Sequence, residues 1–181
     1  MEEKWDESCK SCQAMQGLIS ITNTPRILET PHWIVEHIYP TSIKGWLVVA
    51  LKRHCRALHD LTEEELLEFG KLLKSLCGAL HEALQTESEY VIQFAEGEGF
   101  KHVHFHIIAR LQQWPDKLRG RKVMDAAGSD VENPLSSEEL MPLVLEIRKY
   151  LQKHLPAELS IKTRKVSREE FKGVNFDRET I

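Results

Sequence analysis

Apolar residues gather into short runs in the first half of the chain, and these runs predict strands. Residues 32–38 are rich in Val, Ile and Trp between two prolines, and residues 46–51 are almost continuously apolar, as in a buried central strand. A third run, residues 90–95, is followed by Glu-Gly-Glu-Gly and then by the alternating segment 102–108. Because the connection is short, we expect the last two strands to pair as an antiparallel hairpin.

Two stretches have the spacing of amphipathic helices. Thr62 and Glu65 form a capping-box pattern before the first stretch, and Ser136 and Glu139 form one before the second. The intervening residues 114–134 show no period and are expected to form a long surface loop. The apolar positions expected on the buried faces are Leu66, Phe69, Leu73, Leu76, Leu80 and Leu84 in the first helix, and Leu140, Val144, Ile147 and Leu151 in the second.

Length and composition narrow the class of protein. The chain has 181 residues, of which 41% are hydrophobic and 29% charged, as in a folded globular domain. A net charge of −4 with mixed signs argues against extended nucleic-acid binding. Neither a secretory signal nor an apolar run long enough for a membrane span is present, so we expect a cytoplasmic protein. We assign residues 1–155 to one domain, with its core in 9–112, and residues 156–181 to a C-terminal tail or extension.

The alternating segment carries the strongest chemical signal. It reads His-Val-His-Phe-His-Ile-Ile, and a period of two indicates a strand whose successive side chains point to opposite faces of the sheet. Its apolar residues would face a core, while His102, His104 and His106 would share the other face. Imidazole is suited to metal ligation, nucleophilic attack and proton transfer near neutral pH, so this face predicts a functional site.

A pair of cysteines near the start adds a second candidate site. Cys9 and Cys12 are separated by two residues, which is a two-ligand spacing for zinc. An unreactive surface pair is the simplest alternative, and a redox motif is disfavoured because no thioredoxin-like βαβ pattern surrounds the pair. Cys55 and Cys77 are interpreted as small core residues.

Segment 102–108 resembles the signature of the histidine-triad (HIT) superfamily of nucleotide hydrolases and transferases. Other features agree in order and spacing: the cysteine pair, Gly45 before a buried strand that leads into Lys-Arg-His54, and the helix opened by Thr62. The resemblance covers about residues 9–112. It implies an α+β HIT-like fold with an antiparallel sheet of about five strands, a long packed helix and a C-terminal helix. It also implies a homodimer.

The resemblance further implies a nucleotide-binding hydrolase that cleaves at the α-phosphate of a nucleotide, such as a dinucleoside polyphosphate or a nucleoside phosphoramidate. His104 would attack phosphorus to form a nucleotidyl-histidine intermediate, which water would hydrolyse. His106 would donate a hydrogen bond to a phosphoryl oxygen. His102 is open between a phosphate contact and a metal ligand.

In the zinc-bearing branch of the superfamily, four ligands hold a metal ion. The matching residues in this chain are Cys9, Cys12, His54 and His102. Two thiolates and two imidazoles complete a tetrahedron, so the implied Zn²⁺ is structural and has no open position for water.

The chain departs from the family pattern at three places. Trp46 stands where many members carry histidine, so the usual histidine support behind the triad is absent. The turn before the triad lacks the Gly-Gln-Ser/Thr segment that commonly contacts phosphate, and the acidic residue that often holds the ribose aligns only loosely. The remaining candidates for substrate binding are Gly97, Gly99, Lys101, Glu36 and His37.

Two alternative functions use the same residues. A nucleotidyltransferase would pass the nucleotidyl group from the same histidine intermediate to phosphate or a sugar phosphate. A non-catalytic nucleotide-binding module would use the triad and zinc only to build a pocket. Acceptor competition would identify the transferase, and loss of turnover on replacing His104 would exclude the binding module.

Overall fold

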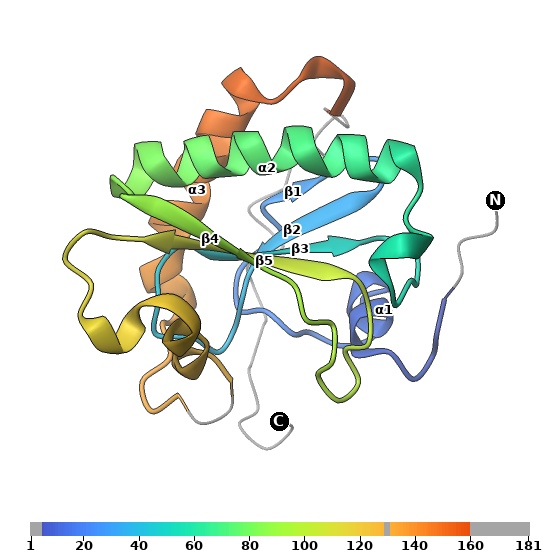
Figure 1. The fold of residues 1–181 in the computed structure, drawn as a ribbon, viewed down its shortest axis with the longest axis horizontal. Helices are drawn as coiled ribbons and strands as arrows, with labels where there is room; N and C mark the ends of the chain where they lie inside the picture. Colours follow the sequence, from blue (N-terminus) through green and yellow to red (C-terminus); the bar gives the residue numbers. More distant parts are fainter. Residues whose placement is uncertain (1–4, 129–130, 160–181) are drawn as a thin grey trace.

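The computed structural model describes residues 5–128 and 131–159. Five strands form one antiparallel sheet in the order β1-β2-β3-β5-β4, which confirms the expected α+β architecture (Figure 1). The strands are β1 (Leu28–Glu29), β2 (Trp33–His37), β3 (Trp46–Leu51), β4 (Ser88–Ile92) and β5 (His104–Arg110). The α-helices are α1 (Lys10–Met15), α2 (Glu63–Leu84) and α3 (Ser137–His154), and short 3₁₀ helices lie at Leu58–Asp60, Asp116–Leu118, Gly120–Ala126 and Ala157–Leu159.

The histidine strand β5 lies between β3 and β4. Its pairing with β4 is antiparallel, as the short connection predicted, and its pairing with β3 sets His104 opposite Ala50 and His106 opposite Val48. Residues directly opposite one another point to the same face of a sheet. The two histidines therefore share a face with the small and branched side chains of the central strand.

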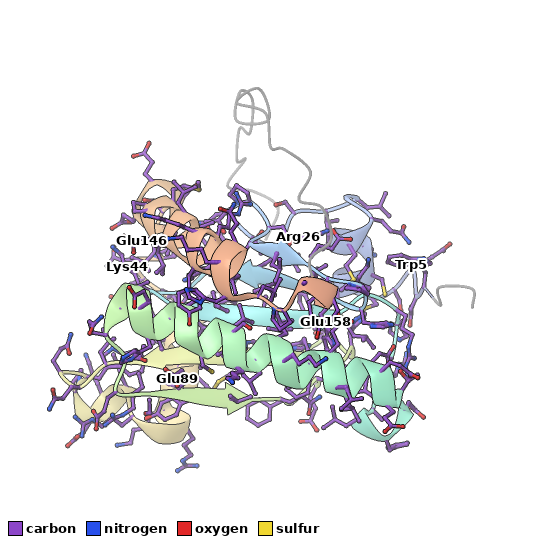
Figure 2. The ribbon with its side chains drawn as sticks, turned by 90° about the horizontal axis from the view of Figure 1, so that it is seen from above. Trp5, Arg26, Lys44, Glu89, Glu146 and Glu158 are labelled. Carbon is purple, nitrogen blue, oxygen red and sulfur yellow. The ribbon has the colours of Figure 1, made fainter. Side chains whose placement is uncertain are left out.

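The other face of the sheet is covered by α2 and α3. Figure 2 shows the two helices side by side above the strands. Gly78 of α2 lies against the Tyr150 ring of α3, where a Cβ would collide with the phenol. The main core fills this layer; its fully buried members include Trp33, Val35, Leu47, Val49, Leu51, Leu72, Leu76, Ala79, Leu80 and Ile107. Within residues 5–128 and 131–159, no helix has the length and apolar character that crossing a membrane requires.

Both predicted capping boxes are present, but the buried face of α2 differs from the expected stripe. Leu66 is exposed, whereas Leu72 and Ala79 are fully buried. Glu65 and Glu68 also lie on the buried face because partners from other segments pair with them. Arg53 donates to Glu65 at 2.6 Å, and His32 lies 2.6 Å from Glu68. With these partners the two glutamates lie on the buried face of α2, which periodicity alone does not reveal.

Residues 114–127 also differ from the expected surface loop. Two 3₁₀ helices bury Trp114, Val123 and Ala126 against Trp46 and other residues on the histidine face of the sheet. This group, with Ile43 and Ile108, is called the minor core below. The minor core covers one end of the histidine face of the sheet and does not extend over the other end. The expected tail beyond residue 159 lies outside the described residues.

Candidate functional site

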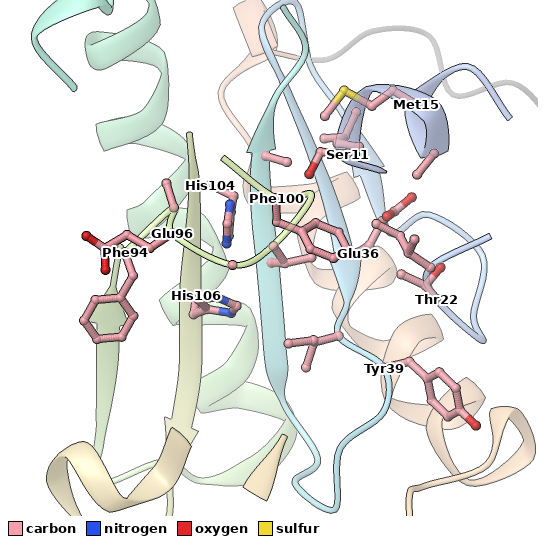
Figure 3. A pocket seen from close by; sticks show the side chains of 18 of the residues that line it. Ser11, Met15, Thr22, Glu36, Tyr39, Phe94, Glu96, Phe100, His104 and His106 are labelled. Atoms are coloured by element: carbon pink, nitrogen blue, oxygen red, sulfur yellow. The ribbon is translucent and has the colours of Figure 1, made fainter. Parts of the chain in front are cut away.

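A cavity of about 320 Å³ opens on the histidine face of the sheet. His104 and His106 project into it from β5, and Ser11 and Met15 of α1 lie across from them with Glu36 of β2 (Figure 3). The volume lies within the range of about 300–1,000 Å³ of small-molecule sites. Most of the wall is apolar, and it includes Ile21, Ile34, Ile38, Val48, Ala50, Phe94, Phe100 and Met124.

His104 has one ring nitrogen bound by the backbone and the other available to the cavity. Its Nδ1–H donates to the carbonyl oxygen of His102 at 2.7 Å, so the lone pair of the neutral ring is on Nε2. Burial lowers the pKa of His104, and the hydrogen bond to His102 opposes this effect. At neutral pH His104 is therefore a neutral imidazole, with its proton on Nδ1 and a free lone pair on Nε2.

His106 has the opposite arrangement. The indole Nε1–H of Trp46 donates to His106 Nδ1 at 3.0 Å, and the indole lies edge-on to the imidazole with ring planes at 83°. Burial, followed by the proximity of His104, lowers the pKa of His106 to about 4. The ring is neutral at pH 7, and its proton is on Nε2 because Nδ1 accepts.

A group of cysteines and histidines lies beside the cavity. One ligand atom from each of Cys9, Cys12, His54 and His102 lies within 4.8 Å of all the others. Three sulfur-to-nitrogen distances in this group are short: Cys9 Sγ to His102 Nδ1 is 3.5 Å, Cys12 Sγ to His54 Nδ1 is 3.4 Å, and Cys12 Sγ to His102 Nδ1 is 3.6 Å. Tetrahedral zinc with ordinary Zn–S and Zn–N bonds has S···N edges of roughly 3.6 Å, so the four donors fit this ion.

The electrostatics of this group also fit a cation. Burial raises the pKa of the Cys12 thiol to about 11, so without a cation the sulfur is a neutral thiol. Burial lowers the pKa of His102 to about 4, which keeps the ring neutral and able to ligate. The Asp6 carboxylate lies 3.5 Å from Nε2 of His54, on the side of the ring away from the sulfurs.

The structure resolves the two sequence interpretations of His102. The ring is fully buried, and its Nε2–H donates to the Leu51 carbonyl at 2.7 Å. Nδ1 faces the two sulfurs, and His102 does not line the cavity. Its place is in the cysteine group, so the expected catalytic role in contacting phosphate does not fit its position.

The short helix α1 joins the two candidate sites. Cys9 caps its N-terminus and Cys12 lies in its first turn, while Ser11 and Met15 line the cavity. The backbone N–H of Lys10 also donates to Gly99 at 2.7 Å, which connects α1 to the turn before the triad. The cavity wall and the cysteine group are therefore both built in part on α1 and its N-cap residue.

The candidates for substrate binding divide into three groups. Glu36 and Gly97 line the cavity with the histidines. Gly99 and Lys101 do not line it and instead border a polar hollow beside Cys9. His37 does not line the cavity, because β2 alternates and turns this residue away from Glu36 toward the helix-covered side of the sheet.

Both nitrogens of His37 are occupied within the protein. Its Nδ1–H donates to the Ile38 carbonyl at 2.9 Å, and Nε2 accepts from the Gly45 N–H at 3.1 Å. Gly45 has φ of 82°, and a Cβ there would approach Leu84 to 2.5 Å. His37 therefore fixes the turn into β3 beneath α2.

Two residues at the site were not found from the sequence. Ser11 brings a buried hydroxyl to the cavity, but nothing in the pattern distinguishes it from the other residue between the two cysteines. Trp46 was noted as the loss of a histidine, whereas the structure shows it bound to the triad. The available signal for Trp46 was its place beside the triad on the adjacent strand.

Comparisons with curated proteins give relatives of two activities. The chain is 25% identical over 139 residues to adenosine 5′-monophosphoramidase hnt1 of Schizosaccharomyces pombe, covering 71% of this chain and 98% of that protein. It is 26% identical over 153 residues to galactose-1-phosphate uridylyltransferase of Thermotoga maritima, covering 75% of this chain. The match spans 45% of the length of the uridylyltransferase.

Solved structures share the fold. A HIT-like protein involved in cell-cycle regulation from Bartonella henselae aligns with a TM-score of 0.62 at 22% identity, over 82% of this chain and 99% of that chain. A zinc-bound histidine triad family protein from Mycobacterium smegmatis aligns with a TM-score of 0.58 at 19% identity, over 78% and 94% of the two chains. At these identities the likeness concerns the fold.

The family assignment rests on the sequence as well as on the fold. Residues 23–113, half of the chain, match the HIT domain, and this range contains the triad and both strands that flank it. The resemblance of segment 102–108 to the histidine-triad signature is thereby confirmed. The chain is a member of the HIT domain family.

Proposed function

We propose that this protein is a nucleotide hydrolase that cleaves the bond between the α-phosphorus of a nucleotide and its leaving group, with a nucleoside phosphoramidate as the favoured substrate class. The observation that carries the proposal is the free Nε2 of His104, directed into an apolar cavity by the bond from Nδ1–H to the His102 carbonyl. The similarity to a monophosphoramidase supports the choice of leaving group.

The reaction proceeds in two displacements at phosphorus. The His104 Nε2 lone pair forms a P–N bond, the bond to the leaving amine breaks, and the amine leaves with a proton. A water molecule then attacks the same phosphorus, the bond to His104 breaks, and the nucleoside monophosphate is released with one proton. Neutral His104 suits this chemistry, because an imidazolium has no lone pair to donate.

The charge on the phosphoryl oxygens is met by donors around the cavity. His106 presents Nε2–H from the next position on the same face, and the Ser11 hydroxyl and the Gly97 backbone line the same cavity. Donors that are already oriented stabilise a transition state without reorganisation. The Glu36 carboxylate lies on the wall across from the histidines and is suited to accept hydrogen bonds from ribose hydroxyls.

The direct test is hydrolysis of adenosine 5′-monophosphoramidate with quantification of AMP and ammonia. Rapid acid quenching and mass spectrometry should show protein heavier by one adenylyl group, localised by peptide mapping to His104. His59→Ala is the matched control, since His59 is an exposed histidine remote from the cavity. Absence of both hydrolysis and adenylylation, in protein of normal thermal stability, would contradict the proposal.

We further propose that Cys9, Cys12, His54 and His102 hold a structural Zn²⁺. The donor set and the S···N distances support this ion, and a zinc-bound relative shares the fold. When bound, the ion would supply a tetrahedral cross-link with no open position for water. Its contribution is to hold α1 against the start of β5.

A transferase remains the second candidate, favoured by the similarity to the uridylyltransferase. Both enzymes would share the first displacement and differ in the acceptor of the second. Preformed adenylyl-protein should therefore be mixed with water alone, with phosphate, or with a sugar phosphate. Discharge that is faster with an acceptor than with water would identify a transferase, and equal rates support the hydrolase.

We also propose a homodimer built on the free edge of the sheet. β4 is the edge strand, and Val91 and Phe94 at and after it are large apolar side chains exposed to solvent. An exposed edge strand with apolar side chains is a ready surface for pairing. Sedimentation of the wild type against Val91→Lys should show a dimer shifted toward monomer by the added charge.

A further inference from the structure

Trp46 is the one departure from the family pattern that contacts a triad histidine. Its indole nitrogen is 3.0 Å from His106 Nδ1, and the indole is fully buried. The pairing of β3 with β5 sets Trp46 opposite Ile108, one step along the same face from the pair of Val48 and His106. The indole thus reaches the imidazole from the adjacent strand.

The chemistry of the indole determines which of the two rings donates the hydrogen bond. An indole nitrogen donates and cannot accept, whereas a histidine at the same place could do either. His106 Nδ1 must therefore be an acceptor. The only position left for the proton of the neutral ring is Nε2, which faces the cavity.

The surroundings hold Trp46 in this orientation. The minor core packs Ile43, Trp114, Val123 and Ala126 around it. The indole meets the imidazole edge-on, with centroids 5.8 Å apart. Because the side chain is enclosed on its other sides, the indole cannot swing to release the hydrogen bond without disturbing this packing.

We propose that Trp46 is a positioning residue that locks His106 in the Nε2–H tautomer and so fixes a hydrogen-bond donor beside the nucleophile His104. This inference deepens the proposed function and rests on it for the identity of the acceptor, a phosphoryl oxygen. It also assigns a role to residues 114–127, which hold the indole and contribute only Met124 to the cavity wall.

Locking the tautomer keeps the two neighbouring histidines distinct. His104 and His106 are neighbours on one face of β5, with ring centroids 5.1 Å apart. Two neutral imidazoles that exchanged tautomers freely would each present a lone pair for part of the time. The His102 carbonyl and the Trp46 indole remove this freedom in opposite senses, giving one acceptor-type and one donor-type nitrogen in the cavity.

The test measures the tautomer directly. Long-range ¹H–¹⁵N correlation spectra of histidine-labelled, zinc-loaded full-length protein distinguish a protonated ring nitrogen from one with a lone pair. In the wild type, His106 should show a lone pair on Nδ1 and a proton on Nε2. A proton on Nδ1 of His106 would overturn the inference, whether or not the protein hydrolyses any nucleotide.

The variants separate donation from packing. Trp46→Phe removes the N–H, and replacement of Trp46 by 3-benzothienylalanine removes it with the ring shape retained. In each case the two ¹⁵N shifts of His106 should move toward one another, and kcat for adenosine 5′-monophosphoramidate should fall about tenfold with a smaller change in KM. Trp33→Phe is the matched control, because it removes an equally buried indole N–H that donates to the Glu65 carbonyl in the helix-covered core, and it should leave both the shifts and kcat unchanged.

The outcomes distinguish the two proposals. Folded Trp46 variants with unchanged ¹⁵N shifts and unchanged kcat would overturn the role of Trp46 even if the wild type is an active hydrolase. A wild type that shows the expected tautomer but no hydrolysis would refute the proposed function and leave the tautomer lock supported. Loss of kcat with unchanged shifts would assign Trp46 to packing and would also overturn the inference.

Discussion

The two ends of one histidine-bearing segment serve different chemistry. At the start, His102 is fully buried with Cys9, Cys12 and His54, and nothing of it reaches the cavity. Four residues later, His106 lines an open apolar cavity. Residue type and spacing are the same at both ends. The difference lies in which atom contacts the second nitrogen of each ring.

The hydrogen bonds at these ring nitrogens determine what each histidine can do. His102 gives its Nε2–H to the Leu51 carbonyl and is left with Nδ1 as the proposed metal ligand. His104 gives its Nδ1–H to the His102 carbonyl and is left with Nε2 as the proposed nucleophile. His106 accepts at Nδ1 from Trp46 and is left with Nε2–H as a donor. The comparison teaches that the hydrogen-bond partner of one ring nitrogen determines whether the other nitrogen carries a proton or a lone pair.

The sharpest way to break the comparison is to remove one histidine at each end. His104→Ala should lower the rate of phosphoramidate hydrolysis by about a thousandfold or more, since a covalent route is lost, and should retain the metal. His102→Ala should lose metal stoichiometrically. Activity assays and elemental analysis of the same preparations check both results. Equal metal loss in the two variants would show that the two ends are not separate.

A cysteine substitution addresses the metal end alone. Cys12→Ser should reduce bound zinc to a small fraction of one ion per chain and lower the melting temperature by about 5 °C or more, because a cross-link between α1 and β5 is lost. Calorimetry with elemental analysis is the measurement. Cys77→Ser is the control, a half-buried thiol on α2 outside the metal group. Full zinc content in the Cys12 variant would contradict the assigned ligands.

His37 sharpens the rule, because both of its nitrogens are occupied and it should serve structure only. Burial lowers its pKa to about 4 in the folded state, against an ordinary value near 6.5. Between these values the unfolded chain binds a proton that the folded chain does not, so the free energy of unfolding falls as the pH decreases. The loss attributable to His37 from pH 7.5 to pH 5 is about 2 kcal/mol.

Urea denaturation at the two pH values measures this loss, and the His37→Gln variant isolates it from the other buried histidines. The variant should be less stable at pH 7.5 and should show a smaller decrease on acidification. An identical decrease in variant and wild type would mean that His37 does not bind its proton differently in the two states.

The smallest expected effect concerns the cavity wall opposite the histidines. Glu36→Gln keeps the shape of the side chain and removes a charge that also pairs with Arg26 at 3.3 Å. KM for adenosine 5′-monophosphoramidate should rise by about three- to tenfold with little change in kcat, since ribose binding contributes equally to ground and transition states. Glu29→Gln is the control, because Glu29 pairs with the same arginine outside the cavity. A change confined to kcat would exclude a role in binding.

The sequence predicted the elements whose signals are local. Four of the five strands followed from alternation and apolar runs, and both long helices from capping boxes and periodic spacing, whereas the two-residue strand β1 and the short helix α1 were not predicted. The minor core was missed because Val123 and Ala126 lie on a 3₁₀ helix and Trp114 on the loop before it, where there is no period to detect. The buried face of α2 was misplaced because Arg53 and His32, which are distant in the sequence, pair with Glu65 and Glu68 and allow them to be buried.

At the site, residue types were predictable and their contacts were not. The cysteine and histidine ligand group was assembled from the family resemblance, and the structure brings its four members together. His37 lies away from the cavity that Glu36 lines, because a shift of one position in a strand reverses the face that a residue occupies. Trp46 and Ser11 could not be assigned, since their roles depend on which neighbour a strand or helix sets beside the triad.

The position of α1 has a thermodynamic consequence. The short helix α1 and its N-cap residue Cys9 carry two of the proposed metal ligands on one side and part of the wall of the proposed nucleotide cavity on the other. Two ligands that order the same element must strengthen each other, and linkage makes the effect reciprocal: if zinc raises nucleotide affinity by some factor, nucleotide raises zinc affinity by the same factor. Oxidation of Cys9 or Cys12 would then weaken nucleotide binding, without any change in the triad itself.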